Sequence, residues 1–298
     1  MAQGLLPGRV VAAHGKRYQV ELADGRILGC VTRGKKTGVA CGDRVQVRPT
    51  GSAQGVIESV GPRESLLYRS DPYRQKVLAA NVTQVIVVVA AVPSFYEELV
   101  NRALVAAEAA HLRSVIVLNK ADLSETAQAQ ARLALYHQLG YPLVKLSATR
   151  DVSPLHPHLA RQVSVLVGQS GMGKSTLVNA LVPGAHAATR EISQALDSGR
   201  HTTTHATLYH LDGESDLIDS PGLQEFGLYH LSPEEVAQAF VEFRPYLGRC
   251  RFHNCRHLVE PGCAILEAAE NGTLSPRRLT AYQAIVREHL DWQARRYA

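Results

Sequence analysis

The first sixty residues alternate apolar and polar positions in five short runs. These runs are GRVVAA, RYQVEL, ILGCVT, DRVQVRP and GVIESV, and glycine-bearing turns such as Asp24-Gly25 separate them. Alternation with a period of two is typical of strands that bury one face. We therefore predict a closed barrel of the oligonucleotide-binding (OB) type over residues 1–62. A generic five-stranded barrel without a nucleic-acid role has the same strand count and stays open as an alternative.

The pattern changes twice further along the chain. Residues 63–80 carry prolines and mixed charges without a sustained period, which predicts a linker. Continuous apolar runs then alternate with helical stretches at 96–111 and 125–139; the runs are VTQVIVVVAA, SVIVLNK, PLVKLSA, SVLVGQS and DLIDSPG. Such runs are typical of a parallel sheet with helices on both faces, so we predict an α/β domain over residues 81–230. Residues 231–298 are predicted to be helical, ending in a helix over 276–295.

Composition narrows the class of protein. The chain has 298 residues, of which 45% are hydrophobic, and this is enough for a multidomain α/β protein without disulfides. The net charge of +5 favours polyanionic partners, and Arg33, Lys35 and Lys36 form a basic loop in the barrel. A merely solvated basic loop is the alternative.

Location is expected to be cytoplasmic, without membrane attachment. No apolar stretch is long enough to span a bilayer, and the start MAQGLLPGRV lacks the layout of a secretion signal. Five cysteines, three of them between positions 250 and 263, fit a reducing compartment with a metal cluster better than a disulfide framework.

A phosphate-binding loop is predicted where GQSGMGKS follows the apolar run SVLV and precedes a helical run. Glycines let backbone N–H groups converge on phosphates, Lys174 supplies a positive charge, and the Ser175 hydroxyl can ligate Mg²⁺. The predicted contact residues are Gly168, Gln169, Ser170, Gly171, Met172, Gly173, Lys174, Ser175 and Thr176.

Guanine selection is predicted from the NKxD element Asn119-Lys120-Ala121-Asp122 after SVIVL. The Asp122 carboxylate would accept two hydrogen bonds from the guanine edge, a donor pair that adenine lacks. The alternative is that Asp122 merely caps the following helix. Ser147 and Ala148, after PLVKL, resemble the SAx element that backs the base in GTPases.

Switch elements are predicted at two places. Asp219-Ser220-Pro221-Gly222 looks like DxxG, in which Asp219 holds Mg²⁺ through water and the Gly222 amide senses the γ-phosphate. In GRHTTTHA, Thr203 is favoured as the further Mg²⁺ ligand, although Thr202 and Thr204 stay open. Leu223 stands where many GTPases have the water-orienting glutamine, so His201 is the catalytic candidate and Gln224 its competitor.

The motifs occur in circularly permuted order. NKxD at 119 and SAT at 147 precede the phosphate loop at 168 and DxxG at 219, whereas ordinary GTPases begin with the phosphate loop. Permutation leaves the nucleotide site intact when the original termini lie close together. DxxG then leads within a few residues into the C-terminal segment, so we expect its ordering by GTP to move that segment.

Four metal ligands are predicted near the C-terminus. Cys250, Cys255, His257 and Cys263 supply three thiolates and an imidazole, a set suited to one structural Zn²⁺. His253 could replace His257, and reduced cysteines in a helical core are the alternative reading. Cys30 and Cys41 are expected to be packing residues of the barrel.

Together, the barrel, the permuted motifs, GRHTTT, LIDSPG and CRFHNCRHLVEPGC resemble the RsgA (YjeQ) family of bacterial small-ribosomal-subunit biogenesis GTPases. The resemblance covers nearly the whole chain. It implies an OB barrel, a permuted GTPase and a zinc domain that dock on 16S rRNA of the 30S subunit in late maturation. It also implies GTP hydrolysis to GDP stimulated by that subunit, release upon hydrolysis, and His201 as the switch histidine. We expect a monomer.

Overall fold

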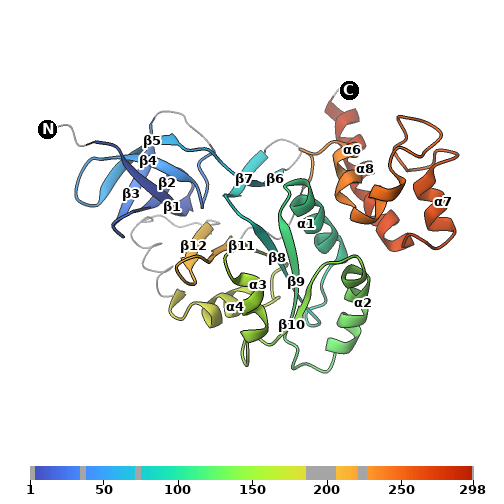
Figure 1. Cartoon of the computed structure of the whole chain (residues 1–298), viewed down its shortest axis with the longest axis horizontal. Helices are drawn as coiled ribbons and strands as arrows, with labels where there is room; N and C mark the ends of the chain where they lie inside the picture. The colour runs from blue at the N-terminus through green and yellow to red at the C-terminus, as the bar shows by residue number, and fades with distance from the viewer. Residues whose placement is uncertain (1–3, 34–37, 71–74, 186–205, 221–226, 297–298) are drawn as a thin grey trace.

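The computed structural model describes residues 4–33, 38–70, 75–185, 206–220 and 227–296. Figure 1 shows a barrel at one side, an α/β part at the centre and a helical part at the other side. No helix among these residues is long and apolar enough to cross a bilayer.

The N-terminal part is the predicted barrel. Its strands are β1 (Leu6–His14), β2 (Arg17–Leu22), β3 (Ile27–Thr32), β4 (Arg44–Pro49) and β5 (Gln54–Val60). β1 pairs with both β2 and β4, and β3 pairs with β5, so the strands close on themselves. Alternate residues, among them Val20, Val47 and Ile57, point into a separate small core. The prediction of a closed five-stranded barrel is confirmed.

The stretch predicted to be a linker contains a β-hairpin. β6 (Leu66–Ser70) and β7 (Gln75–Ala80) pair antiparallel, with a register shift between Leu67 and Tyr68. That shift interrupts the alternation, which is why the sequence showed no period there. Ala79 bridges to Cys41 of the barrel, and the Ala80 amide donates to the Cys41 carbonyl at 2.9 Å. The hairpin is therefore fixed to the barrel.

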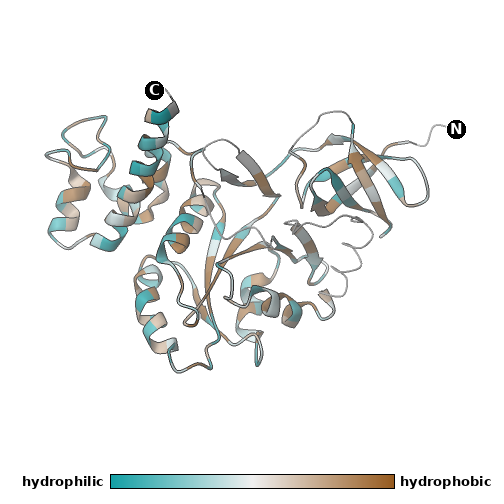
Figure 2. Cartoon of the chain, turned by 180° about the vertical axis from the view of Figure 1, so that it is seen from behind, coloured by the Kyte–Doolittle hydropathy of each residue, from teal (hydrophilic) through white to brown (hydrophobic). Residues whose placement is uncertain are grey.

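The central sheet carries five parallel strands in the order β10-β9-β8-β11-β13. They are β8 (Gln84–Ala90), β9 (Arg113–Asn119), β10 (Leu143–Lys145), β11 (Val163–Val167) and β13 (Asp216–Asp219). Helices α1 (Glu97–Ala109) and α2 (Thr126–Gln138) lie on one side, and the short η1 (Ser153–Leu155), α3 (His156–Leu159) and α4 (Lys174–Leu181) on the other. Every residue of β8 is buried, and the sheet strands are among the brown, apolar segments in Figure 2.

One strand departs from the predicted parallel sheet. β12 (Ala206–His210) runs antiparallel to β13, and its other edge pairs with β1 of the barrel, Ala12 opposite Thr207 and Ala13 opposite Ala206. The central sheet and the barrel thus share one hydrogen-bonded series of eleven strands. The sequence ATLYH is short and follows a polar stretch, so it carried no clear strand signal.

Ion pairs accompany this junction. Arg9 of β1 lies 2.5 Å from Asp216 of β13. His210 of β12 places Nε2 2.8 Å from Glu21 and Nδ1 2.6 Å from Asp216. Four side chains from both parts therefore form one charged network beside the shared strand.

The C-terminal part is helical, as predicted. It contains α6 (Pro233–Ala239), η2 (Val241–Tyr246), α7 (Ala264–Glu270) and α8 (Pro276–Arg296). A capping box of Ser232 and Glu235 fixes the start of α6. α8 packs back against α1 through Arg278, which is only 1% exposed. The Arg278 guanidinium donates to Asn101 of α1 at 2.5 Å and to Glu242 of η2 at 2.5 Å.

Candidate nucleotide site and candidate metal centre

The predicted nucleotide motifs meet at one edge of the central sheet. The phosphate loop follows β11, Asn119 ends β9, and Asp219 ends β13, so all three stand at the carboxyl ends of parallel strands. Open α/β sheets bind ligands along this edge. Residues from distant parts of the sequence are thereby brought together.

Close backbone packing shapes the phosphate loop. Gly168 has φ +154°, and a Cβ there would lie 2.3 Å from the Val88 carbonyl oxygen. Gly173 has φ +85°, and a Cβ there would lie 2.4 Å from Asn119 Nδ2. Met172 is fully buried, with Sδ 3.1 Å from the amide nitrogen of Ala90. Both glycines are required for the chain to pass this close to β8 and β9.

Lys174 holds the inside of the loop. Its Nζ donates to the Gly168 carbonyl at 2.5 Å and to the Gln169 carbonyl at 2.8 Å. Burial lowers the pKa of Lys174, and the negative charge of Asp219 opposes this effect. Ser175 and Thr176 are exposed at the first turn of α4. The start of α4 thus carries a lysine and two exposed hydroxyl residues in consecutive positions, a composition that suits phosphate and its metal ion.

Asn119 and Lys120 connect the predicted base-binding element to the predicted phosphate loop. Asn119 is 1% exposed; its Nδ2 donates to the Met172 carbonyl and its Oδ1 accepts from the Ala148 amide, both at 2.9 Å. Lys120, at φ +57°, donates from Nζ to the Gly171 carbonyl at 2.7 Å and to the Val92 carbonyl at 2.8 Å. Two neighbouring side chains therefore fix NKxD, SAT and the phosphate loop relative to one another.

Asp122 lies beside the SAT element with a stable negative charge. A hydrogen bond from Ser147, then one from its own backbone amide and the charge of Arg150, hold its pKa below the usual range. The Arg150 guanidinium is 3.7 Å away. Helix α2 starts at Thr126 and its N-cap residue is Glu125, so Asp122 does not serve as the helix cap. Its carboxylate is available as a hydrogen-bond acceptor.

Part of the predicted switch region lies outside the described residues. This holds for the catalytic candidate, its competitor, the threonines and the end of DxxG: His201, Gln224, Thr202, Thr203, Thr204, Gly222 and Leu223. Asp219 is half-buried at the end of β13. The predicted roles of these residues remain predictions.

The loop after β8 contacts the candidate site and was not predicted. Gln169 accepts from the Tyr96 amide at 3.1 Å and donates to the Ser94 carbonyl at 3.2 Å, while Lys120 reaches Val92 in the same loop. This loop also leaves a parallel strand at its carboxyl end, which is the signal that could have indicated it.

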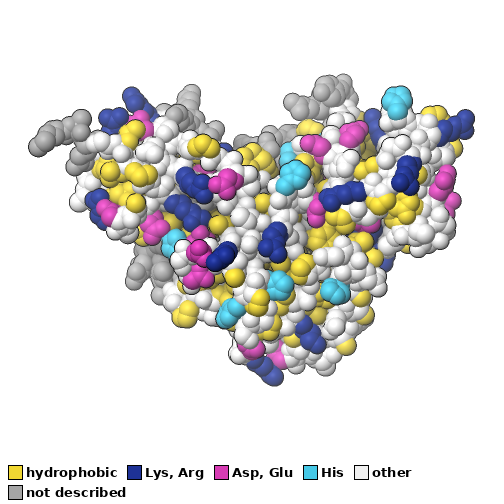
Figure 3. All heavy atoms as spheres, in the orientation of Figure 1, with side chains coloured by type: hydrophobic (Ala, Val, Ile, Leu, Met, Phe, Trp, Pro, Cys, Tyr) yellow, Lys and Arg dark blue, Asp and Glu magenta, His cyan; other side chains and the backbone are white. Residues whose placement is uncertain are grey.

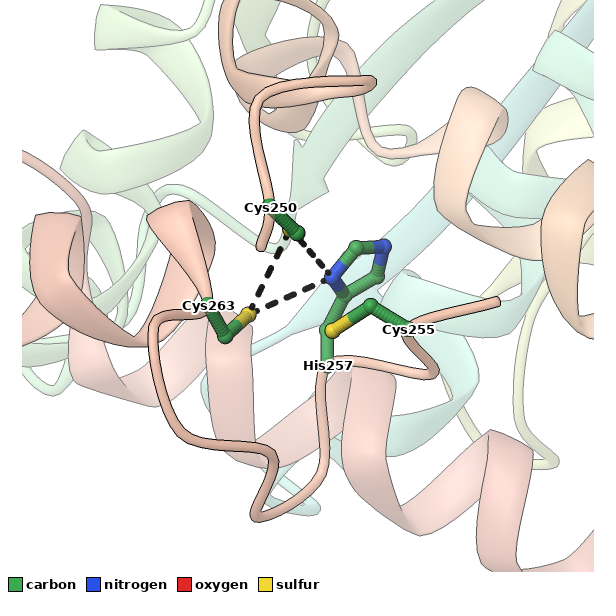
Figure 4. A group of neighbouring side chains, drawn as sticks. All are labelled: Cys250, Cys255, His257 and Cys263. Atoms are coloured by element: carbon green, nitrogen blue, oxygen red, sulfur yellow. Dashed lines mark hydrogen bonds between the residues drawn. The ribbon is translucent and has the colours of Figure 1, made fainter. Parts of the chain in front are cut away.

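The four predicted metal ligands converge in one cluster (Figure 4). Cys250 Sγ lies 3.5 Å from His257 Nδ1 and 3.8 Å from Cys263 Sγ, and His257 Nδ1 lies 3.3 Å from Cys263 Sγ. The donor atoms of all four residues, Cys255 included, lie within 4.8 Å of one another. Tetrahedral Zn²⁺ with normal bond lengths requires S···S edges of about 3.8 Å and S···N edges of about 3.6 Å. The donor set therefore fits a metal ion of this kind.

Backbone contacts support the metal-ligand loop. The Glu260 carboxylate accepts from the amides of Arg256, Leu258 and Val259 at 2.8–3.0 Å. Tyr282 of α8 donates its hydroxyl to the Arg256 carbonyl at 2.9 Å. His253 is exposed and is not part of the cluster, so His257 is the imidazole of this group. Glu260 was not predicted, because a carboxylate that bonds only to backbone amides leaves no spacing pattern.

A family model and the curated relatives of this chain point to the same protein family. The model of the RsgA GTPase family matches residues 60–229. The small ribosomal subunit biogenesis GTPase RsgA of Nitrosospira multiformis is 57% identical over 282 residues, which cover 94% of this chain and 90% of that protein. The RsgA of Nitrosomonas europaea is 54% identical over 286 residues, covering 95% and 91% respectively.

Solved structures agree with this result over the full length. YjeQ from Thermotoga maritima superposes with a TM-score of 0.73 at 33% identity, covering 96% of this chain and 99% of the other. YloQ, described as a circularly permuted GTPase, gives a TM-score of 0.70 at 26% identity, covering 97% and 96%.

Proposed function

Because the chain belongs to the RsgA family of GTPases, we propose that it hydrolyses GTP to GDP and phosphate in late maturation of the 30S ribosomal subunit. Its relatives carry the name small ribosomal subunit biogenesis GTPase. One observation carries the proposal: the side chains of Asn119 and Lys120 donate hydrogen bonds to carbonyls of the phosphate loop. These bonds hold a guanine-type NKxD element next to that loop.

Recognition of guanine is assigned to Asp122, backed by Ser147 and Ala148. The Asp122 carboxylate would accept from the two nitrogen donors on the guanine edge. Lys120, whose amine is fixed by two carbonyls, would place its aliphatic chain beside the base. Adenine offers no matching donors, so its binding would leave the carboxylate unpaired.

Phosphate binding is assigned to the loop and to Lys174. The loop amides and the start of α4 provide positive potential, and the lysine would exchange its carbonyl partners for phosphate oxygens. Mg²⁺ would be held by Ser175, with Thr203 completing its ligands and Asp219 acting through water. When bound, the ion would supply positive charge that neutralises the nucleotide phosphates.

Hydrolysis is assigned to His201, which would orient and deprotonate the attacking water. Leu223 supplies no polar group after DxxG, and no arginine finger is evident in the sequence. A missing finger is worth about 10³ to 10⁵ in rate, so we expect slow intrinsic turnover that the small subunit stimulates. Hydrolysis would then release the protein.

The cluster of Cys250, Cys255, His257 and Cys263 is assigned to one structural Zn²⁺. Four protein ligands leave no open position, and the ion would fix the loop between η2 and α7. Cys255→Ser is expected to lose the metal, whereas Cys30→Ser in the barrel is expected to keep about one ion per chain. Elemental analysis of native protein measures this, and a zinc-free wild type would contradict the assignment.

The partner is assigned as 16S rRNA of the 30S subunit, bound by a cytoplasmic monomer. On the face shown in Figure 3, Lys and Arg side chains are spread over all three parts and interspersed with acidic ones. Such a distribution favours several moderate phosphate contacts over one strongly basic field.

Hydrolysis assays with purified small subunits test the proposal. GTP turnover is expected to rise strongly when 30S subunits are added, and the rise is expected to weaken as salt increases. ATP is expected to bind far more weakly than GTP. Equal binding of ATP and GTP would contradict the nucleotide assignment, and turnover indifferent to 30S subunits would favour a nucleic-acid-binding scaffold stabilised by GTP.

A further inference from the structure

Gln169, the second residue of the phosphate loop, reaches with its side chain to the loop that joins β8 to α1. Its Oε1 accepts from the Tyr96 amide at 3.1 Å, and its Nε2 donates to the Ser94 carbonyl at 3.2 Å. One partner is a donor and the other an acceptor, so a single orientation of the side-chain amide satisfies both. The side chain thus makes a two-point contact with the backbone of residues 94–96.

The contact with Tyr96 also completes the start of α1. Tyr96 is the N-cap residue of this helix, and in a capping box a Glu or Gln at the third helical position accepts from the N-cap amide. α6 is capped in this way, since Glu235 accepts from the Ser232 amide at 2.7 Å. α1 has Leu99 at the third position, and leucine offers no acceptor. Gln169 therefore supplies to α1, from the phosphate loop, the hydrogen bond that α6 makes internally.

The loop that Gln169 contacts is held independently of the phosphate loop. The Arg132 guanidinium of α2 donates to the Ser94 hydroxyl at 3.0 Å and to the Phe95 carbonyl at 3.1 Å. It also lies over the buried Phe95 ring, 4.0 Å from the ring centroid. Residues 94–96 are therefore anchored to α2. The contact with Gln169 thus fixes the phosphate loop to a support that is already in place.

The first part of the phosphate loop depends on this contact more than the rest does. Gly171, at the centre of the loop, accepts from Lys120. The Gln169 carbonyl accepts from the Lys174 amine at 2.8 Å, but in the proposed nucleotide complex this amine turns to phosphate oxygens. The carbonyl then loses its partner. Among the described residues, the side-chain amide is the hydrogen-bonded anchor that Gln169 keeps.

We propose that Gln169 is a positioning residue of the GTPase reaction, because its side chain fixes the first part of the phosphate loop to the loop between β8 and α1. The amides of the phosphate loop are the donors assigned to the phosphates. Such donors stabilise developing charge best when they are held in place before the reaction. The side chain is engaged by Ser94 and Tyr96, so it acts through the backbone that it holds. The inference rests on the proposed function and deepens it.

Gln169→Met in the full zinc-loaded chain tests the role in single-turnover GTP hydrolysis without small subunits. Methionine is about as long as glutamine, but it donates no hydrogen bond and accepts only weakly. We expect kcat to fall about fivefold to tenfold and KM to stay within about threefold, since a loosened loop can still close around bound phosphates. Gln169→Ala, which also lacks both groups, is expected to show the same loss.

Gln162→Met is the matched control, because Gln162 directly precedes β11 whereas Gln169 follows that strand. The Gln162 side chain also contacts the chain beside β8, accepting from the Thr83 hydroxyl at 2.7 Å, but at the opposite edge of the sheet. Its loss is expected to leave kcat unchanged. Melting temperatures show that each variant is folded.

Amide hydrogen exchange with GDP bound separates positioning of the phosphate loop from support of the helix. In Gln169→Met, the amides of residues 169–173 are expected to exchange faster than in wild type, whereas residues 100–109 of α1 keep their protection. Faster exchange of α1 alone would overturn the proposal.

Two kinetic results would also overturn the positioning role. One is wild-type kcat in folded Gln169→Met. The other is an equal loss of kcat in Gln162→Met, which would reflect a general weakening around β11. A wild-type protein that does not hydrolyse GTP would instead remove the proposed function. The exchange of residues 169–173 would then decide alone whether Gln169 holds the phosphate loop.

Discussion

At the scale of single residues, the proposed specificity for guanine depends on the charge and position of Asp122. Its carboxylate is held ionised by the Ser147 hydroxyl and lies next to the loop that Asn119 fixes. A carboxylate accepts at both oxygens, whereas an amide offers one acceptor and one donor. The isosteric change to asparagine therefore tests recognition without changing volume.

Asp122→Asn is expected to weaken GTP binding by at least about 100-fold, because one guanine donor loses its acceptor and meets another donor. Xanthosine triphosphate, which has a carbonyl at that position, is expected to bind the variant better than GTP. Competition against a fluorescent nucleotide measures both affinities. Asp24→Asn is the control, since Asp24 is likewise hydrogen-bonded but lies in a barrel turn.

Sequence could predict the candidate residues whose pattern is local. The glycines of the phosphate loop, the NKxD element and the Cys/His spacing each stand within a few consecutive positions, and the structure brings the two nucleotide motifs together at one sheet edge and the four Cys/His residues together in one cluster. The contacts of Gln169 and Glu260 escaped prediction, because their partners are backbone groups or residues distant in sequence.

At the scale of elements, the same distinction applies to strands. The continuous apolar runs of β8, β9 and β11 predicted a buried sheet, since a strand that is buried on both faces is apolar at nearly every position. The sequences of β12 and of the β6–β7 hairpin contain no continuous apolar run of this kind. β12 is short, and its position follows from pairing with β1 and β13, which no local pattern encodes.

Protonation of His210 on β12 is expected to strengthen the junction with the barrel. Partial burial lowers the pKa of His210, but hydrogen bonds to Glu21 and Asp216 and their charges outweigh it and raise the pKa above its ordinary value. The protonated form thus gains more from folding than the neutral form. This stabilisation is fully present below the unfolded pKa of about 6.5 and is lost as the pH rises through the raised folded pKa.

Unfolding by urea between pH 6 and pH 9 measures this effect. Wild type is expected to lose more stability than His210→Gln over the alkaline part of the range. His111→Gln, which alters an exposed histidine after α1, is the control. Parallel curves for wild type and His210→Gln would contradict the linkage.

At the scale of the whole molecule, a buried arginine joins the helical part to the central part. Arg278 of α8 donates to Asn101 of α1 and to Glu242 of η2, and it lies over the Phe240 ring at 4.3 Å. Its neighbour Arg277 reaches Glu97 at 2.6 Å but is 49% exposed. Two adjacent arginines of one helix therefore form ion pairs with glutamates, one of them buried and the other exposed.

Arg278→Ala is expected to destabilise the protein by about 3 kcal/mol, since it removes a buried guanidinium and leaves the Glu242 carboxylate, only 11% exposed, without its charge partner. Arg277→Ala is expected to cost no more than about 1 kcal/mol, because solvent screens the exposed pair. The free energy of unfolding from urea titrations compares the two. Equal losses would show that burial does not decide the strength of this junction.

The strand shared by barrel and central sheet also affects the order in which the chain can fold during synthesis. β1 leaves the ribosome before its partner β12, which follows about 195 residues later. Until then, the backbone groups of β1 near Ala12 and Ala13 have no β12 to pair with and are open to other extended chains. A nascent barrel of this protein is therefore most prone to wrong pairing before the second half of the chain has been made.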